Sequence, residues 1–127
     1  MRRVLLDTQV FVAAYLGDPL PKKVRQLLSD SAVERLVSTA SLIEIAIKNA
    51  IGKIQMSDGQ VLQAARDLAV TILPVNAQHA LRLFRLPPHH RDPFDRAIIA
   101  TALVESLPLL GGDRLFRRYA GLTVVWS

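Results

Sequence analysis

Residues 90–103 combine an acidic helix start with an apolar helix body. Asp92 and Asp95 are three residues apart, and Pro93 follows the first of them. Proline is favoured just inside a helix start because its missing N–H would be unpaired there anyway, so Asp92 is predicted to be the N-cap and Asp95 falls in the first turn. Residues 97–104 are apolar apart from one threonine, which is typical of a buried helix whose first turn is held rigidly. A capped helix would explain this stretch alone equally well, so the other acids matter.

Three further carboxylates stand close to the ends of predicted strands. They are Asp7 after strand 3–6, Asp113 two residues after strand 108–111, and Glu44 early in the helix 40–51 that follows strand 35–38. In open α/β sheets, ligands bind outside the carboxyl ends of the strands. The chain itself places Asp7 and Asp113 at that edge, and a neighbouring helix start would bring Glu44 there. Asp95 depends on the fold to bring it in.

Each of these acids also has a purely structural interpretation. Asp7 and Asp113 can cap the helices that follow them, and Ser41 with Glu44 matches a capping box. Glu44 and Lys48 can form a helix-surface ion pair. Three points favour function: isoleucines flank Glu44, where an unpartnered charge is costly, the acids recur at strand ends, and no matching set of arginines neutralises them all.

Four carboxylates in one crevice repel one another and require a cation. Oxygen-only donors suit Mg²⁺ or Mn²⁺ rather than zinc. Such an ion can activate water and stabilise a leaving oxygen in phosphodiester hydrolysis. The chain carries 16 Lys and Arg against 11 Asp and Glu, a formal charge of +5, which gives weak support for a nucleic-acid partner because the basic residues are scattered.

Short apolar strands alternate with helices along the whole chain. The strands are predicted at 3–6, 35–38, 70–73, 108–111 and 122–125, and the helices at 9–16, 21–30, 40–51, 59–69, 77–85, 93–106 and 114–119. This alternation predicts one α/β domain over residues 1–127, with a central parallel sheet of four to five strands covered on both faces. Helix 40–51 is apolar nearly all round, which favours a subunit interface on part of it.

Composition narrows the class of protein. Half of the residues are hydrophobic, which excludes global disorder, and the absence of cysteine excludes disulfides and thiolate metal sites. The opening MRRVLLD begins like a signal peptide, but its apolar run stops at Asp7. No window approaches the roughly 20 apolar residues of a membrane span. A soluble, cytoplasmic protein is expected.

Four segments together resemble a known family. LLDTQVF at 5–11, SLIEIAIKNAIGKI at 41–54, HHRDPFDRAIIATAL at 89–103 and LPLLGGDRLF at 107–116 are similar to PIN-domain nucleases, most of all to the VapC toxins of toxin–antitoxin pairs. The resemblance covers nearly the whole chain and implies a three-layer α/β/α fold. It implies a Mg²⁺- or Mn²⁺-dependent endoribonuclease that forms a homodimer and is blocked by a VapB-type antitoxin. It also implies that Asp7, Glu44, Asp95 and Asp113, here called the acidic quartet, are the catalytic and metal-binding residues, with Asp92 as the helix cap.

The sequence departs from the family pattern at two places. Relatives often carry a Thr two residues before the last acid, where this chain has Gly111, and often carry His where it has Gln9. Both departures bear on rate and metal occupancy more than on the fold. Candidates for a supporting hydroxyl or a phosphate contact are Thr8, Lys48, Arg96 and Arg114.

The histidines are expected to play no part in the chemistry. His89 and His90 are adjacent and cannot readily act as a pair on one atom, so they are predicted to lie in a solvated loop. His79 has no second histidine at ligand spacing, which argues against zinc.

Two other functions remain open at this point. A PIN-like module that binds RNA or a partner without cutting is compatible with Gly111. A signalling receiver domain is less favoured, because the first strand offers one acid instead of two and the third strand ends in Pro74 rather than a phospho-acceptor Asp.

Overall fold

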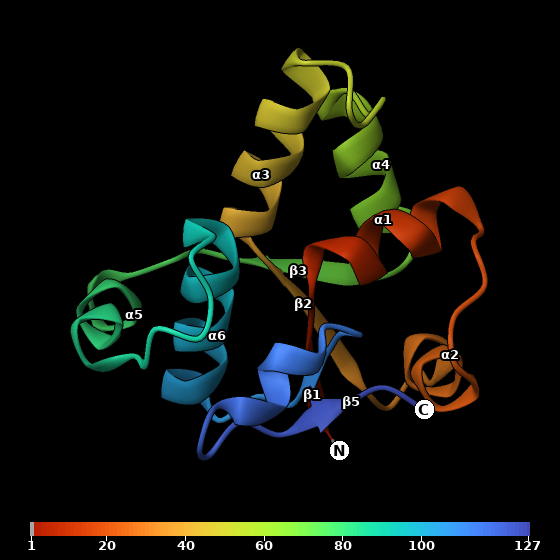
Figure 1. Ribbon diagram of the computed structural model, residues 1–127. Helices are drawn as coiled ribbons and strands as arrows, with labels where there is room; N and C mark the ends of the chain where they lie inside the picture. The colour runs from red at the N-terminus through yellow and green to blue at the C-terminus, as the bar shows by residue number, and fades with distance from the viewer. Residues whose placement is uncertain (1) are drawn as a thin grey trace.

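The computed structural model describes residues 2–127 and shows a five-stranded, fully parallel sheet in the order β3-β2-β1-β4-β5 (Figure 1). Met1, the first residue of the predicted domain, lies outside the described residues. The strand β1 (Arg3–Leu6) occupies the centre, between β2 (Glu34–Ser38) and β4 (Leu109–Leu110). Leu6 pairs with both Val37 and Leu110, so the carboxyl ends of these three strands meet at one edge.

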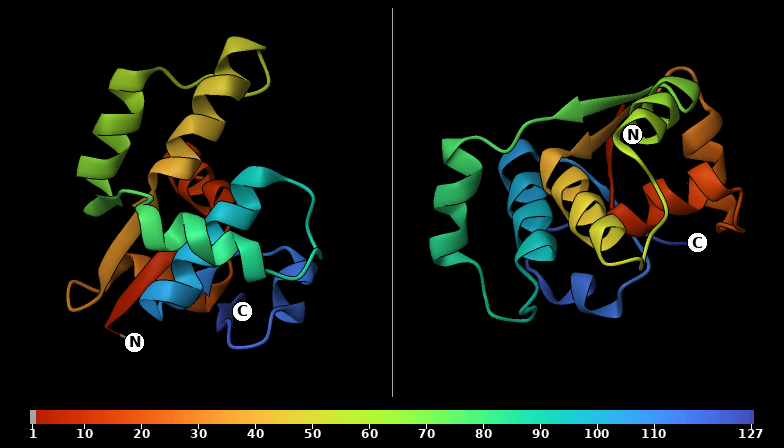
Figure 2. Two further views of the ribbon diagram at one scale, coloured as in Figure 1. Left: turned by 90° about the vertical axis from the view of Figure 1, so that its left-hand side faces the viewer. Right: turned by 90° about the horizontal axis from the view of Figure 1, so that it is seen from above.

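The outer strands are β3 (Val70–Leu73) and β5 (Val124–Val125). The helices are α1 (Thr8–Leu16), α2 (Lys22–Ser29), α3 (Thr39–Ala50), α4 (Asp58–Asp67), α5 (Ala77–Arg82) and α6 (Pro93–Glu105), with short 3₁₀ turns η1 (Leu83–Arg85) and η2 (Arg114–Arg118). Figure 2 shows the helices on both sides of the sheet, with α3 and α4 projecting together beyond its edge.

The alternation of side chains along the strands divides the core into two layers. In β1, Val4 and Leu6 point to one face, where α1, α2, α3 and α4 cover them, and Leu5 points to the other, where α6 and η2 cover it. Successive residues of a strand face opposite sides, so continuous apolar strands require cover on both. The predicted α/β/α architecture is therefore confirmed.

Most of the predicted elements are present, and four details differ from the prediction. The last two strands are only two residues long, and residues 114–118 form a 3₁₀ turn. The cap of α4 is Ser57, whose side chain makes a reciprocal capping box with Gln60, not Asp58. Ser41 forms no capping box with Glu44, because α3 begins earlier and Ser38 caps it.

The two long inner helices differ in what they leave exposed. α6 buries the continuous stretch from Ile98 to Ala102 at its middle, within the predicted apolar run. α3 leaves Ile43, Ile47 and Ile51 about half exposed, an apolar stripe at helical spacing. Every helix within residues 2–127 is too short or too polar to cross a lipid bilayer.

Candidate functional site

All four members of the acidic quartet line one small pocket at the carboxyl edge of the sheet. The pocket has a volume of about 170 Å³, and its remaining lining comes from Thr8, Gln9, Lys48 and Asp92. Asp7 directly follows β1, and Asp113 comes two glycines after the adjacent strand β4. Glu44 comes from α3, and Asp95 from the first turn of α6. The fold therefore brings Asp95 to the other three, which the sequence alone could not require.

Asp7 is the most deeply buried acid of the quartet, with an exposed fraction of 5%. One of its oxygens, Oδ1, accepts a hydrogen bond of 2.8 Å from the Thr8 backbone N–H at the start of α1. Burial and the negative charges of Asp95, Glu44 and Asp113 raise its pKa from 3.8 to about 7. The cap therefore accounts for one lone pair of this carboxylate and does not offset the repulsion.

Glu44 is buried to a similar extent and has one partner. Lys48 Nζ lies 2.6 Å from Glu44 Oε2, the predicted i, i+4 pair. Glu44 Oε1 is fully buried and has no hydrogen-bond partner among the described residues. A buried carboxylate oxygen without a donor is costly, so this oxygen marks a place where a cation fits.

Asp95 and Asp92 have separate roles at the start of α6. Asp92 Oδ1 accepts from the backbone N–H groups of Phe94 and Asp95, at 2.8 Å and 3.2 Å, so Asp92 is the N-cap as predicted. The Asp95 side chain is left free for the pocket. Burial and the negative charge of Asp92 raise the pKa of Asp95 to about 6.

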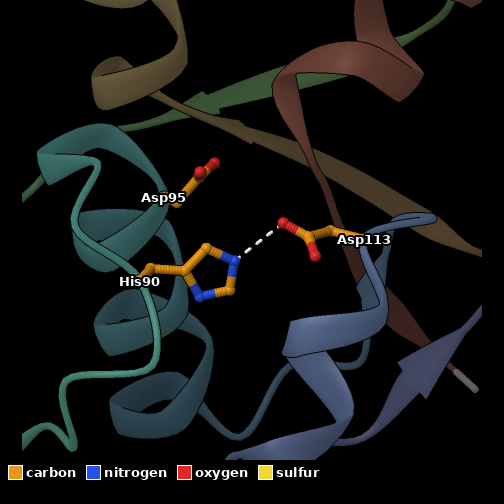
Figure 3. A group of neighbouring side chains, drawn as sticks. All are labelled: His90, Asp95 and Asp113. Carbon is orange, nitrogen blue, oxygen red and sulfur yellow. Dashed lines mark hydrogen bonds and ion pairs between the residues drawn. The ribbon is translucent and has the colours of Figure 1, made fainter.

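Asp113 is the most exposed member of the quartet and the best supplied with donors. Its Oδ1 accepts from the Leu115 backbone N–H at 2.9 Å, and its Oδ2 lies 2.8 Å from His90 Nε2 (Figure 3). Partial burial acts to raise the pKa of Asp113, but the hydrogen bonds from His90 and Leu115 outweigh it and lower the pKa. This carboxylate is therefore ionised throughout the neutral range.

His90 was wrongly predicted to be solvated. It is buried, with an exposed fraction of 7%, and its ring stacks on Phe116 and Tyr119 at centroid distances of 5.3 Å and 5.6 Å. Its Nε2, one oxygen of Asp95 and one of Asp113 lie within 4.8 Å of one another, close enough to hold a metal ion. The local sequence around His90 gave no signal for its contact with Asp113, because the contact joins residues 23 positions apart.

The four predicted supporting residues lie in different surroundings. Thr8 Oγ1 donates to Ser41 Oγ at 2.8 Å and ties α1 to α3 behind the pocket, while Lys48 lies in the pocket wall. Arg96 donates to the backbone carbonyls of Leu86, Pro87 and His90, which secures the loop before α6. Arg114 is exposed and lies beside Asp113 in sequence without lining the pocket.

The space around position 111 leaves no room for a side chain, which explains why a glycine stands there. A Cβ at this position would lie 2.6 Å from Phe116 Cε2 and 3.2 Å from the Cβ of Asp7. Real Cβ atoms do not approach a ring so closely, so any larger residue here displaces Phe116. The Thr hydroxyl that relatives often carry at this position is therefore absent because the fully buried Phe116 ring occupies the space that a side chain would need.

A family comparison identifies the domain. The model of the PIN domain matches residues 4–122. This chain belongs to the PIN-domain family. No curated protein sequence matches it.

Solved structures agree with this PIN fold. The VapBC2 complex of Rickettsia felis, bound to a promoter DNA fragment, contains a chain that superposes with a TM-score of 0.72 at 17% identity, covering 98% of this chain and 99% of that one. DNA-bound VapBC from Salmonella typhimurium gives a TM-score of 0.71 at 15% identity, over 98% of each chain. A toxin–antitoxin complex from Klebsiella pneumoniae gives 0.66 at 20% identity, over 96% and 95%. At these identities the likeness establishes the shared fold.

Proposed function

We propose that this PIN domain is a Mg²⁺- or Mn²⁺-dependent endoribonuclease and the toxin of a toxin–antitoxin pair. The observation that carries the proposal is the convergence of the acidic quartet, from four separate elements, on one pocket that contains an unpartnered buried oxygen of Glu44. A structural cluster of caps would not leave two carboxyl groups with pKa values raised to about 7 and about 6.

The residues present fit a hard divalent cation. Asp7, Glu44, Asp95 and Asp113 would hold it, and all their donor atoms are carboxylate oxygens. When bound, the cation supplies an activated water and charge stabilisation at the phosphate and the leaving oxygen. Its charge would also favour the ionised forms of Asp7 and Asp95, whose pKa values are otherwise raised by burial and repulsion.

The chain's own residues divide the remaining tasks. Lys48 neutralises one oxygen of Glu44 and presents its ammonium at the pocket wall, where a backbone phosphate of RNA would find a donor. Gln9, exposed at the same wall, offers an amide for a neighbouring phosphate or sugar. Asp113, ionised and held by two donors, keeps its carboxylate directed at the pocket.

Two apolar surfaces are suited to bind the two protein partners that we propose, an antitoxin and a second copy of this chain. An apolar groove of about 520 Å³ runs between α3 and α4, lined among others by Leu42, Ile45 and Met56, and fits an apolar segment of a VapB-type antitoxin. The exposed isoleucine stripe of α3 supports a homodimer. Sedimentation equilibrium of the purified chain tests the dimer, and a monomer at micromolar concentration would contradict it.

The function is tested by metal-dependent stability and cleavage in the same preparation. A ligand that binds only the folded chain raises its stability by about 2.7 kcal/mol at 100 times its dissociation constant. We expect Mg²⁺ or Mn²⁺ to raise the melting temperature after EDTA treatment and to permit cleavage of a pool of single-stranded RNAs. Both effects should disappear in Asp95→Asn and persist in Asp58→Asn, a matched change at an exposed helix start.

The outcomes separate the two functions considered. Metal binding with cleavage supports the nuclease. RNA binding without cleavage, in wild-type protein that binds metal, would favour a module that binds and does not cut. Failure of metal to stabilise the wild type would contradict the metal site itself.

A further inference from the structure

The buried phenol of Tyr119 contacts His90 twice. Its oxygen accepts from the His90 backbone N–H at 3.0 Å and lies 2.9 Å from His90 Nδ1. Tyr119 is 2% exposed, and burial raises the pKa of its hydroxyl, which therefore keeps its proton at neutral pH. These two groups on His90 are the only hydrogen-bond partners of the phenol oxygen within residues 2–127.

The single proton of the phenol decides which nitrogen of neutral His90 carries a hydrogen. The backbone N–H already occupies one lone pair of the phenol oxygen, so the O–H satisfies its own donor by pointing at Nδ1. Nδ1 is then the acceptor of the ring, and Nε2 carries the proton. That proton points at Asp113 Oδ2, 2.8 Å away.

From this hydrogen-bond chain we propose that His90 is a positioning residue, fixed by Tyr119 as the Nε2–H tautomer, that orients the Asp113 carboxylate and does not itself ligate metal. The compact His90, Asp95 and Asp113 group resembles a mixed nitrogen and oxygen metal site (Figure 3). With Nε2 protonated, its lone pair is absent and only oxygens face the ion. The arrangement selects hard cations such as Mg²⁺ over metals that prefer imidazole.

The placement of Asp113 explains why such a device is needed. Its side chain is 38% exposed and stands on a turn after two glycines. The Leu115 backbone N–H holds only Oδ1, so a second contact at Oδ2 is needed to stop the carboxylate from rotating. His90 is itself immobilised by its stacking on Phe116 and by the Arg96 bond to its carbonyl. Tyr119 and Asp113 lie at opposite ends of η2, so the imidazole also clamps this turn against the loop before α6.

The tautomer is observable directly by two-bond ¹H–¹⁵N correlation of the ¹⁵N-labelled full chain at about pH 8, a pH above the reference value for the imidazole group. The His90 signals, identified by their loss in His90→Gln, should show a protonated Nε2 and a lone pair on Nδ1, unchanged when Mg²⁺ is added. His79 is an internal reference, because its Nδ1 accepts from the Asn76 backbone N–H at 3.1 Å and its proton therefore sits on Nε2 too. A proton on Nδ1 of His90, or a shift of Nε2 to a metal-bound position, would overturn the proposal.

Variants test the two links of the chain separately. Tyr119→Phe should convert the His90 spectrum to that of a mixture of tautomers. Tyr15→Phe, a matched change at a tyrosine that takes no part in these hydrogen bonds, should leave the spectrum unchanged. Calorimetric Mn²⁺ affinity should fall about tenfold in His90→Ala, and His90→Gln, which keeps an amide donor towards Asp113, should recover most of it. Equal losses in Ala and Gln would contradict positioning through the Nε2 donor.

The inference on metal affinity rests on the proposed function, but the tautomer does not. If the wild-type chain binds no metal, the proposed metal site is wrong. The spectrum of His90 still tests whether Tyr119 fixes the tautomer of His90, because that measurement does not need a metal ion.

Discussion

Replacing Asp7 by Asn should stabilise the metal-free chain, although it alters a residue at the centre of the site. In the folded protein the pKa of Asp7 is about 7 against 3.8 for an ordinary Asp. At about 1.36 kcal/mol for each pKa unit, the ionised carboxylate destabilises the fold by about 4 kcal/mol. Asn removes the charge, and its side-chain oxygen can still accept from the Thr8 backbone N–H.

The pH dependence has a definite sign. Because the folded pKa is raised, the folded chain holds the Asp7 proton more tightly than the unfolded chain does. The corresponding stability is fully present below the unfolded pKa of 3.8 and is lost as pH rises through about 7. Between about pH 5 and about pH 8, Asp7 alone contributes a loss of roughly 3 kcal/mol. Asp95, with a pKa of about 6, adds a loss of the same sign.

The assay is urea unfolding in EDTA at about pH 5 and about pH 8, with wild type, Asp7→Asn and the control Asp58→Asn. The wild type and the control should lose stability across this interval, and Asp7→Asn should lose roughly 3 kcal/mol less. At about pH 8, saturating Mg²⁺ should restore the wild type and leave Asp7→Asn unchanged. Either of two results would contradict a destabilising charge on Asp7. One is an Asp7→Asn chain less stable than wild type at about pH 8 without metal, and the other is a variant whose free energy of unfolding falls as much as that of the wild type between about pH 5 and about pH 8.

Three further changes test other parts of the site. Gly111→Ala should cost about 1–3 kcal/mol in urea unfolding, because the new Cβ meets the Phe116 ring at 2.6 Å, and a neutral result would show that the ring yields freely. Asp92→Ala should cost about 1 kcal/mol by loss of the α6 cap while changing Mn²⁺ affinity, measured by calorimetry, far less than the matching change at a quartet acid. Lys48→Met should destabilise the metal-free chain by at least about 1 kcal/mol, because the buried Glu44 carboxylate loses its positive partner. Thermal unfolding should show that Mg²⁺ restores part of this stability, and a loss of stability that Mg²⁺ does not reduce would contradict the role assigned to the charge of Lys48.

The order of the helices and strands could be predicted because it depends on residues that are close together in the sequence. Apolar runs such as Arg3–Leu6 and Val70–Leu73 have the length of strands, and Pro93 after Asp92 marks a helix start by local backbone chemistry. The cap of α4 was misassigned because Ser57 and Asp58 are both good caps. The choice depended on which of the two makes a reciprocal bond with Gln60.

Asp7, Asp113 and Glu44 could be assigned to the carboxyl edge of a parallel sheet from the sequence, because they stand just after strands or at the start of the helix that follows one. Asp95 could not be assigned in that way, because only the folded chain brings the start of α6 to the same pocket. Only the tertiary structure decided how each acid is held. His90 reaches Asp113 across 23 positions, and the orphaned oxygen of Glu44 follows from what surrounds α3. Hydrogen-bond partners and burial depend on segments that are distant in the chain, and no periodicity or local propensity records which segments those are.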